Sequence, residues 1–128
     1  MTVDDWPTLA EFDAEFGNGP HTYIYGLFDP RDGELRYIGK SDRPRGRYAN
    51  QLNERASTHR CNWFAELRSL DMKPIQKILD AVPRGSAWQS VEVAYIRGAK
   101  AAGCRLVNGT RGGDGVGELP TESRDRIR

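Results

Sequence analysis

This 128-residue sequence has few residues of the kinds that cross-link a small protein or hold it in a membrane. Its two cysteines, Cys61 and Cys104, lie too far apart to form a metal-ligand pair, and they are typical of reduced intracellular thiols. No apolar run approaches the ~20 residues that cross a bilayer, and the amino terminus lacks the basic and apolar regions of a signal peptide. We therefore expect a cytoplasmic protein with no membrane partner.

The chain also has little net charge, +1 at pH 7, but that charge is unevenly distributed. Residues 1–20 contain five Asp and Glu residues and no Lys or Arg. The remaining residues hold all 19 basic residues and the other 13 of the 18 acidic ones, which gives them a net charge of +6. An acidic leader on a basic body suits a nucleic-acid-binding protein. Scattered solvated charges would give the same count.

A predicted β-hairpin over residues 21–41 is the stretch around which the chain is arranged. Two runs rich in Tyr, Ile, Leu and Phe flank the turn-forming segment 29–33, Asp-Pro-Arg-Asp-Gly. Because side chains alternate along a strand, each strand has one set on a single side: Tyr23, Tyr25 and Leu27 in the first, and Leu35, Tyr37 and Gly39 in the second. If the pairing of the two strands brings these sets to the same side of the sheet, two phenols and the Gly39 backbone line one patch. Strand propensity alone also explains the tyrosines.

The rest of the chain, one domain by its length, combines helical patterns with one further strand. The spacing of apolar residues and the capping residues predict helices over residues 5–16, from Pro44, over 62–70 and over 86–103, with a strand over 75–82. Ser41 and Asp42 are expected to cap the second helix, and a capping box at Ser86 the last. We predict an α/β (α+β) fold, with a small three-stranded antiparallel sheet flanked by helices.

Two groups of charged residues are candidates for chemistry. Glu92 lies on the border of the buried face of the predicted 86–103 helix, where a carboxylate costs free energy unless a cation satisfies it. A structural salt bridge and a divalent metal ion would both meet that need. The densest basic cluster follows the second strand, which favours contact with phosphate over simple solvation, and it consists of Lys40, Arg43, Arg45 and Arg47.

The triplet Tyr23-Ile24-Tyr25 followed by Tyr37-Ile38-Gly39 resembles the paired signature of the GIY-YIG nuclease family, with Tyr23 in place of the usual glycine. Later residues match the family's arginine, histidine, helical glutamate and asparagine in order and in type: Arg47, His59, Glu92 and Asn108. The glycine-rich run 109–115 is similar to the end of phage and homing-type members. The chain then divides into an acidic helical extension at 1–20, a GIY-YIG nuclease domain at 21–115, and a basic tail at 116–128 that resembles the start of a linker or DNA-binding region.

The resemblance implies a metal-dependent DNA endonuclease of the kind found in phages and mobile elements. Members hydrolyse phosphodiester bonds with one divalent ion and leave a 5′-phosphate and a 3′-hydroxyl. By this likeness Glu92 binds one Mg²⁺ or Mn²⁺ ion, Arg47 holds the scissile phosphate, and Asn108 braces the site through hydrogen bonds. One metal centre cuts one strand at a time, so double-strand cleavage would need a dimer on DNA or two visits.

The resemblance also assigns the water-activating residues. Tyr25 and Tyr37 would jointly activate the water, and His59 would relay the proton. A free phenol titrates near pH ~10, so Lys40 and Arg47 are the cations expected to lower a tyrosine pKa. The residues expected to bind DNA are Lys40, Arg43 and Arg45.

Two other classes of protein stay open at this point. One is a nucleic-acid-binding module of the same fold that does not cut, or that needs a partner to do so. The other is a structural protein with a coincidental motif, which would have no affinity for DNA at low salt.

Overall fold

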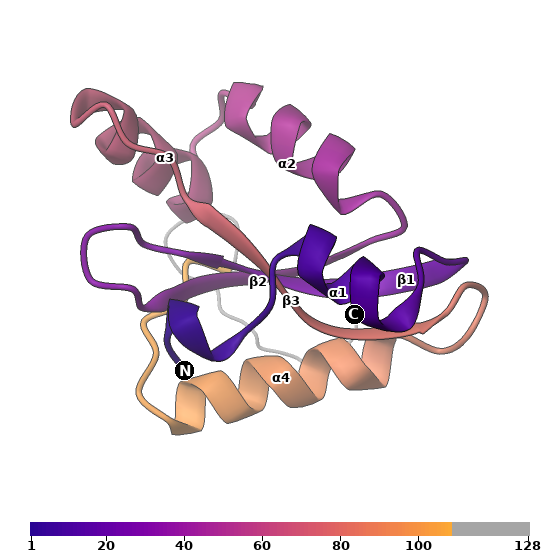
Figure 1. Ribbon diagram of the computed structural model, residues 1–128. Coiled ribbons are helices and arrows are strands. Elements are labelled where there is room, and N and C mark those ends of the chain that lie inside the picture. Colours follow the sequence, from indigo (N-terminus) through magenta and orange to yellow (C-terminus); the bar gives the residue numbers. More distant parts are fainter. Residues whose placement is uncertain (109–128) are drawn as a thin grey trace.

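The computed structural model of the protein describes residues 1–108, which form an α+β fold with helices over both faces of one sheet (Figure 1). In chain order its elements are η1 (Val3–Asp5, a 3₁₀ helix), α1 (Leu9–Phe16), β1 (His21–Phe28), β2 (Leu35–Ser41), α2 (Pro44–Asn53), α3 (His59–Ser69), β3 (Ile75–Pro83) and α4 (Gln89–Ala101). The predicted three-stranded antiparallel sheet flanked by helices is confirmed. The glycine-rich run 109–115 and the tail 116–128 lie outside the described residues.

Strand β1 is the centre of the sheet, whose order is β2-β1-β3 and whose two pairings are both antiparallel. Every residue of β1 after His21 is buried. The predicted hairpin turn is closed by backbone hydrogen bonds from Asp29 N to the Glu34 carbonyl and from Gly33 N to the Asp29 carbonyl. Gly33 has a φ of 75°, which glycine adopts without the cost that a side chain would add.

Two apolar clusters pack on opposite faces of the sheet. The first, here called the tyrosine face, lies against α1, α2 and α3, and its buried members are Tyr23, Tyr25, Leu27, Trp63, Phe64, Leu67, Ile78 and Val107. The second, here called the α4 face, lies against α4 and η1, and its buried members are Ile24, Phe28, Leu35, Ile38, Leu79 and Ala99. Both clusters draw on β1, because alternate side chains of a strand point to opposite faces.

A bulge in β2 corrects one part of the predicted hairpin. The register shifts between Leu27 and Phe28, so that Arg36 is an extra residue on the opposing strand. Leu35 therefore packs in the α4 face and does not share a face with Tyr37, as simple alternation predicted.

The starts of the helices follow local capping more closely than apolar spacing. The helix predicted over 5–16 begins only at Leu9, because Pro7 separates it from η1 and the Thr8 hydroxyl caps it by accepting from the Glu11 backbone N–H. Helix α3 begins at His59, earlier than predicted, with Thr58 as its cap.

The predicted caps of α2 and α4 are wrong. Helix α2 does begin at Pro44, but Ser41 Oγ accepts from Arg43 N and no side chain caps the helix. Ser86 N donates to the Pro83 carbonyl in a turn, so α4 begins three residues later than expected and has no side-chain cap.

Both cysteines are free thiols, and Cys61 is buried whereas Cys104 is partly exposed. Within residues 1–108, no helix has the combination of length and apolar character that a membrane crossing needs.

Candidate active site

A pair of tyrosine rings on adjacent strands forms the centre of the site. Tyr25 on β1 pairs with Gly39 on β2, and the ring centroids of Tyr25 and Tyr37 lie 6.2 Å apart. A Cβ atom on Gly39 would lie 2.6 Å from the Tyr25 hydroxyl oxygen, so the glycine leaves the room that this ring needs. The predicted patch of two phenols and the Gly39 backbone is confirmed.

Tyr25 is the more deeply buried of the two tyrosines. It is 1% exposed, and its hydroxyl donates to Gln51 Oε1 on α2 at 3.1 Å. Burial raises the pKa of Tyr25, the neighbouring Tyr37 raises it further, and Arg47 lowers it to a smaller extent. Tyr25 therefore keeps its proton at neutral pH and is a poor general base. The partly exposed Tyr37 is the better candidate of the jointly predicted pair.

An ion-pair network lies beside Tyr37, where α2 ends and α3 begins. Arg60 Nη1 donates to the Tyr37 hydroxyl at 3.3 Å, and its guanidinium carbon lies 5.4 Å from the ring centroid. Arg60 also pairs with Glu54, which has an oxygen 3.6 Å from Arg47 Nη1. Burial opposes the charge of Arg60, but Tyr37 and Glu54 together raise its pKa overall. Two guanidinium groups therefore accompany the tyrosine pair.

His59 is placed differently from the other predicted residues. It is the exposed first residue of α3, and it forms no hydrogen bond within the described part of the chain. The side chain that reaches Tyr37 from this helix is that of the next residue, Arg60. The proton relay through His59 stays a prediction.

The sequence did not predict a functional role for three residues of this network, namely Gln51, Glu54 and Arg60. Gln51 lies one helical turn after Arg47, so its side of α2 could have been inferred from spacing. Glu54 and Arg60 flank the connection between α2 and α3, where no periodic pattern indicates which side chains meet.

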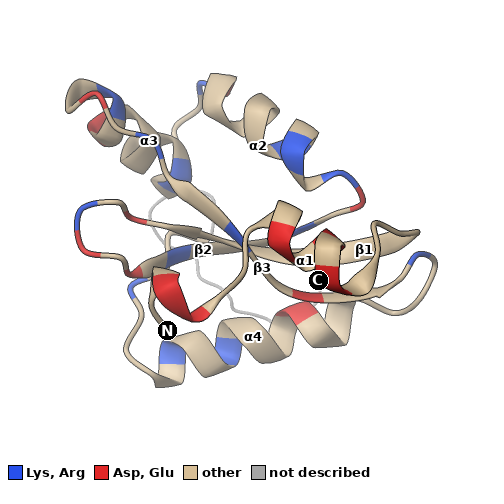
Figure 2. Cartoon of the chain, viewed as in Figure 1, with Lys and Arg blue, Asp and Glu red and all other residues tan. Residues whose placement is uncertain are grey.

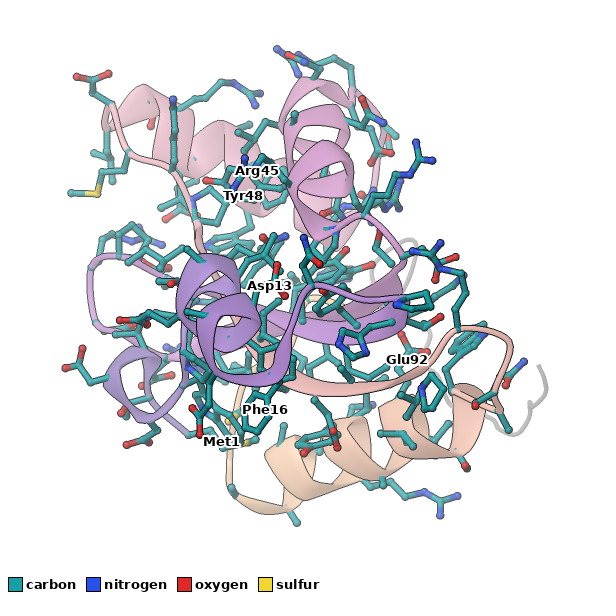
Figure 3. The ribbon with its side chains drawn as sticks, turned by 45° about the vertical axis from the view of Figure 1, so that its right-hand side comes forward. Met1, Asp13, Phe16, Arg45, Tyr48 and Glu92 are labelled. Carbon is teal, nitrogen blue, oxygen red and sulfur yellow. The ribbon has the colours of Figure 1, made fainter. Side chains whose placement is uncertain are left out.

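Glu92, labelled in Figure 3, lies in the first turn of α4. Its side chain is partly buried, and no hydrogen bond or salt bridge from residues 1–108 reaches its carboxylate. Burial raises the pKa of Glu92 to about 7, and the charge of Lys40 opposes this rise only in part. The structural salt bridge that the sequence left open as an alternative is therefore not formed within the part of the chain that the structure describes.

Lys40 belongs to the Glu92 side of the site. Its Nζ atom lies 4.6 Å from the ring centroid of Trp88, the residue that precedes α4. Lys40 was expected to lower a tyrosine pKa, but the cation that acts in this way on Tyr25 is Arg47. The reason is strand alternation, which directs the Lys40 side chain to the face opposite Gly39.

The candidate site therefore has two parts on opposite sides of the sheet. In Figure 3, α2 with Arg45 and Tyr48 lies above the sheet and α4 with Glu92 lies below it. Strand β2 connects the two parts, since Tyr37 belongs to the tyrosine face and Lys40 contacts α4.

Asn108 supports β2 between these two parts. Its Nδ2 donates to the Ile38 carbonyl at 2.7 Å, and its Oδ1 accepts from Ile38 N at 3.0 Å. The side-chain amide thus satisfies both backbone groups of Ile38 on the strand edge that β1 leaves open. Asn108 thus forms bracing hydrogen bonds of the kind that was expected, and its role in a catalytic site stays a prediction.

Arg43 and Arg45 are exposed where β2 leads into α2. Figure 2 shows basic residues along this connection and acidic residues on η1 and α1, so the charge asymmetry of the sequence is also spatial. No ion pair within residues 1–108 involves either arginine. Both are therefore available to a polyanion.

Tyr23, which departs from the family signature, is held by α1. Its hydroxyl donates to Asp13 Oδ1 at 2.8 Å, and burial together with this bond raises the pKa of Tyr23 to about 12. The phenol that replaces glycine therefore has a structural partner and stays protonated.

Residues 1–108 contain no group of three or more His, Cys, Asp and Glu side chains that could together hold a metal ion. A single carboxylate such as Glu92 is a ligand set that suits Mg²⁺, which keeps most of its waters and takes further oxygens from substrate.

Comparison of the chain with protein-family models, with curated proteins and with solved structures found no match. The resemblance to GIY-YIG nucleases therefore depends on the residues described above and stays a prediction.

Proposed function

We propose that this protein is a metal-dependent DNA endonuclease of the GIY-YIG type. The observation that carries the proposal is the Tyr25–Tyr37 pair above Gly39, with Arg47 and Arg60 beside it. Strand propensity accounts for tyrosines in a sheet, but it does not account for two guanidinium groups next to their hydroxyls.

Hydrolysis of a phosphodiester requires an oriented water and stabilisation of the charge on the phosphate. In this proposal Arg47 and Arg60 donate hydrogen bonds to the phosphate oxygens, as planar guanidinium groups do well. Tyr37, whose hydroxyl oxygen accepts from Arg60, orients the attacking water; as the phenolate it accepts the proton of that water and becomes the phenol. Tyr25 keeps its own proton and acts as a hydrogen-bond donor.

Glu92 fits the role of the single metal ligand because its carboxylate is partly buried and unpaired within residues 1–108. A bound Mg²⁺ or Mn²⁺ ion would supply stabilisation of the negative charge on the phosphate and on the leaving oxygen. Lys40 would lie beside this ion and add to the positive charge at the phosphate.

The test is cleavage of supercoiled plasmid with Mg²⁺ or Mn²⁺, with EDTA as the control. We expect metal-dependent nicks that DNA ligase can reseal, because ligation needs a 5′-phosphate and a 3′-hydroxyl. Intact plasmid with either metal, under conditions in which the protein binds DNA, would reject the endonuclease.

The second candidate is a DNA-binding module of the same fold that does not cut, or that needs a partner. The observation in its favour is that Glu92 and the tyrosine pair lie on elements packed against opposite faces of the sheet. This candidate predicts binding to DNA without cleavage under all of the metal conditions above.

A further inference from the structure

Glu54, the residue that ends α2, lies between two arginines of the candidate active site. Its carboxylate pairs with Arg60, and one of its oxygens lies 3.6 Å from Arg47 Nη1. Arg60 in turn donates to the Tyr37 hydroxyl. A negatively charged group of this chain thus occupies the position between two guanidinium groups and next to a tyrosine.

The surrounding donors outnumber the acceptors that the described residues supply. Within residues 1–108, Gln51 Nε2 and Arg60 Nε are buried and have no hydrogen-bond partner. Gln51 is 0% exposed, and its Oε1 already accepts from Tyr25. A buried donor without an acceptor destabilises the fold, because the donor has lost its hydrogen bond to water. The cluster therefore has two buried donors for which residues 1–108 supply no acceptor.

A purely structural salt bridge between α2 and α3 explains this arrangement less well. The side chains of Glu54 and Arg47 are 35% and 39% exposed, and ion pairs with this exposure contribute little to stability. Glu54 can therefore release Arg47 at little cost, whereas its pairing with the less exposed Arg60 is the larger contribution that an incoming anion must replace. Arg60 is only 16% exposed, and its contacts with Tyr37 hold it in place when Glu54 leaves.

We propose that Glu54 is an internal substitute for a phosphate of the DNA backbone, and that Arg60 is a second arginine of the phosphate site. When DNA binds, a phosphodiester displaces the Glu54 carboxylate and pairs with Arg47 and Arg60. Arg60 then holds the Tyr37 hydroxyl beside the bound phosphate. This inference rests on the proposed function, since it names the group that binds at the same site.

The first test compares the DNA affinity of the wild type, Glu54→Gln and the control Glu66→Gln, in EDTA and across a salt series. Glu66 pairs with Arg31 on the surface, so its substitution changes the net charge equally while leaving this network intact. We expect Glu54→Gln to bind about fivefold more tightly at low salt. Its slope of log affinity against log salt should stay that of the wild type, because the same phosphate contacts form in both proteins once Glu54 is displaced.

The same affinity for Glu54→Gln and Glu66→Gln would overturn the proposal. Thermal unfolding of both variants serves as the check that they are folded. The Glu54 carboxylate is partly exposed and is replaced by an amide of the same shape, so we expect both midpoints to stay close to that of the wild type.

The second test titrates inorganic phosphate into the metal-free protein and follows the arginine side-chain N–H signals by NMR. We expect the signals of Arg47 and Arg60 to shift, and to do so at lower phosphate concentration in Glu54→Gln. Shifts confined to the exposed Arg43 and Arg45 would overturn the proposal.

Neither test requires cleavage, so the two proposals can fail separately. Tighter binding by Glu54→Gln in a protein that never cuts DNA would keep the phosphate site and reject the endonuclease. Cleavage by a protein in which Glu54→Gln binds like Glu66→Gln would keep the endonuclease and reject the role of Glu54.

Discussion

Polar side chains on the two faces of the sheet differ in whether they have hydrogen-bond partners within the fold. On the tyrosine face, the hydroxyls of Tyr23, Tyr25 and Tyr48 each donate to a partner within the fold. On the α4 face, Tyr95 is likewise bonded, but Glu92 has no partner among residues 1–108. A buried polar group with a partner is explained by folding, whereas one without a partner is a cost that a ligand can remove. Among these tyrosines and this carboxylate, Glu92 is therefore the group that is open to a ligand, because no partner among residues 1–108 reaches its carboxylate.

The largest effect on cleavage should come from substituting Glu92, the carboxylate without a partner among residues 1–108. We expect Glu92→Gln to lower the rate of metal-dependent cleavage by at least about 1,000-fold, because it removes the charge that binds the ion but keeps the shape. DNA affinity in EDTA should stay within about twofold of the wild type. A variant that cuts at the wild-type rate would show that Glu92 is not the metal ligand.

Substituting phenylalanine for Tyr25 or for Tyr37 should lower the cleavage rate to different extents, although each change removes only a hydroxyl. We expect Tyr37→Phe to lower the cleavage rate by about 100-fold, in the range of general-base catalysis. Tyr25→Phe should lower it less, because the raised pKa of Tyr25 makes it a donor and not a base. Single-turnover rates at saturating protein measure both. A larger loss for Tyr25→Phe would reverse the assignment.

The close packing under the tyrosines can be tested at Gly39. Gly39→Ala should lower the free energy of unfolding by about 1–3 kcal/mol, since the new Cβ would lie 2.6 Å from the Tyr25 hydroxyl oxygen. The matched control is Gly46→Ala on α2, where a Cβ meets nothing within 4 Å. We expect that variant to be as stable as the wild type or slightly more so. Denaturant unfolding compares them, and equal stability would contradict the close approach.

Glu92 should also make stability depend on pH in the metal-free protein. Its pKa is about 7 in the folded state against an ordinary 4.5. Between these two pH values the unfolded chain has lost the proton and the folded chain keeps it, so the free energy of unfolding falls as pH rises. At pH 8 we expect Glu92→Gln to be more stable than the wild type by about 3 kcal/mol, with no difference at pH 4.

Thermal unfolding in EDTA measures this difference. Glu66→Gln, which changes a largely exposed carboxylate, should show no such gain. Mg²⁺ at pH 8 should then stabilise the wild type and leave Glu92→Gln unchanged. A gain for Glu92→Gln that persists at pH 4 would mean that the buried charge is not its cause.

The smallest effect is expected from the exposed arginines. Arg45→Ala should weaken binding to all DNA sequences alike and make the slope of log affinity against log salt less steep by about 0.9. Binding to several unrelated duplexes across a salt series measures both quantities. Strong discrimination among the duplexes would show that the chain has its own base-reading element.

The sequence predicted the parts of the fold that depend on local pattern. Alternation in the hairpin predicted that Tyr25 and Tyr37 share a face, and the glycine between them was recognised from the same pattern. It did not predict the bulge at Arg36, because one extra residue in a strand leaves no mark in composition.

The contacts between α2 and α3 also could not be predicted. Arg60 meets Tyr37, and Glu54 meets both Arg60 and Arg47, only because the connection between the helices folds back on the sheet. Such contacts depend on tertiary packing, which a single sequence does not reveal. The place of Glu92 on the border of the buried face was correctly inferred from helical spacing.

In the proposed mechanism both faces of the sheet act on one phosphodiester, and the nicking of a labelled duplex tests this. A duplex with a 5′-label on one strand is incubated with excess protein and Mg²⁺, and the nicking rate and product ends are compared for the wild type, Glu92→Gln and Tyr37→Phe. We expect the wild type to produce nicks with a 5′-phosphate and a 3′-hydroxyl. We also expect loss of nicking in both variants, while both still bind the duplex in EDTA. Nicking that survives either substitution at the wild-type rate would contradict the mechanism.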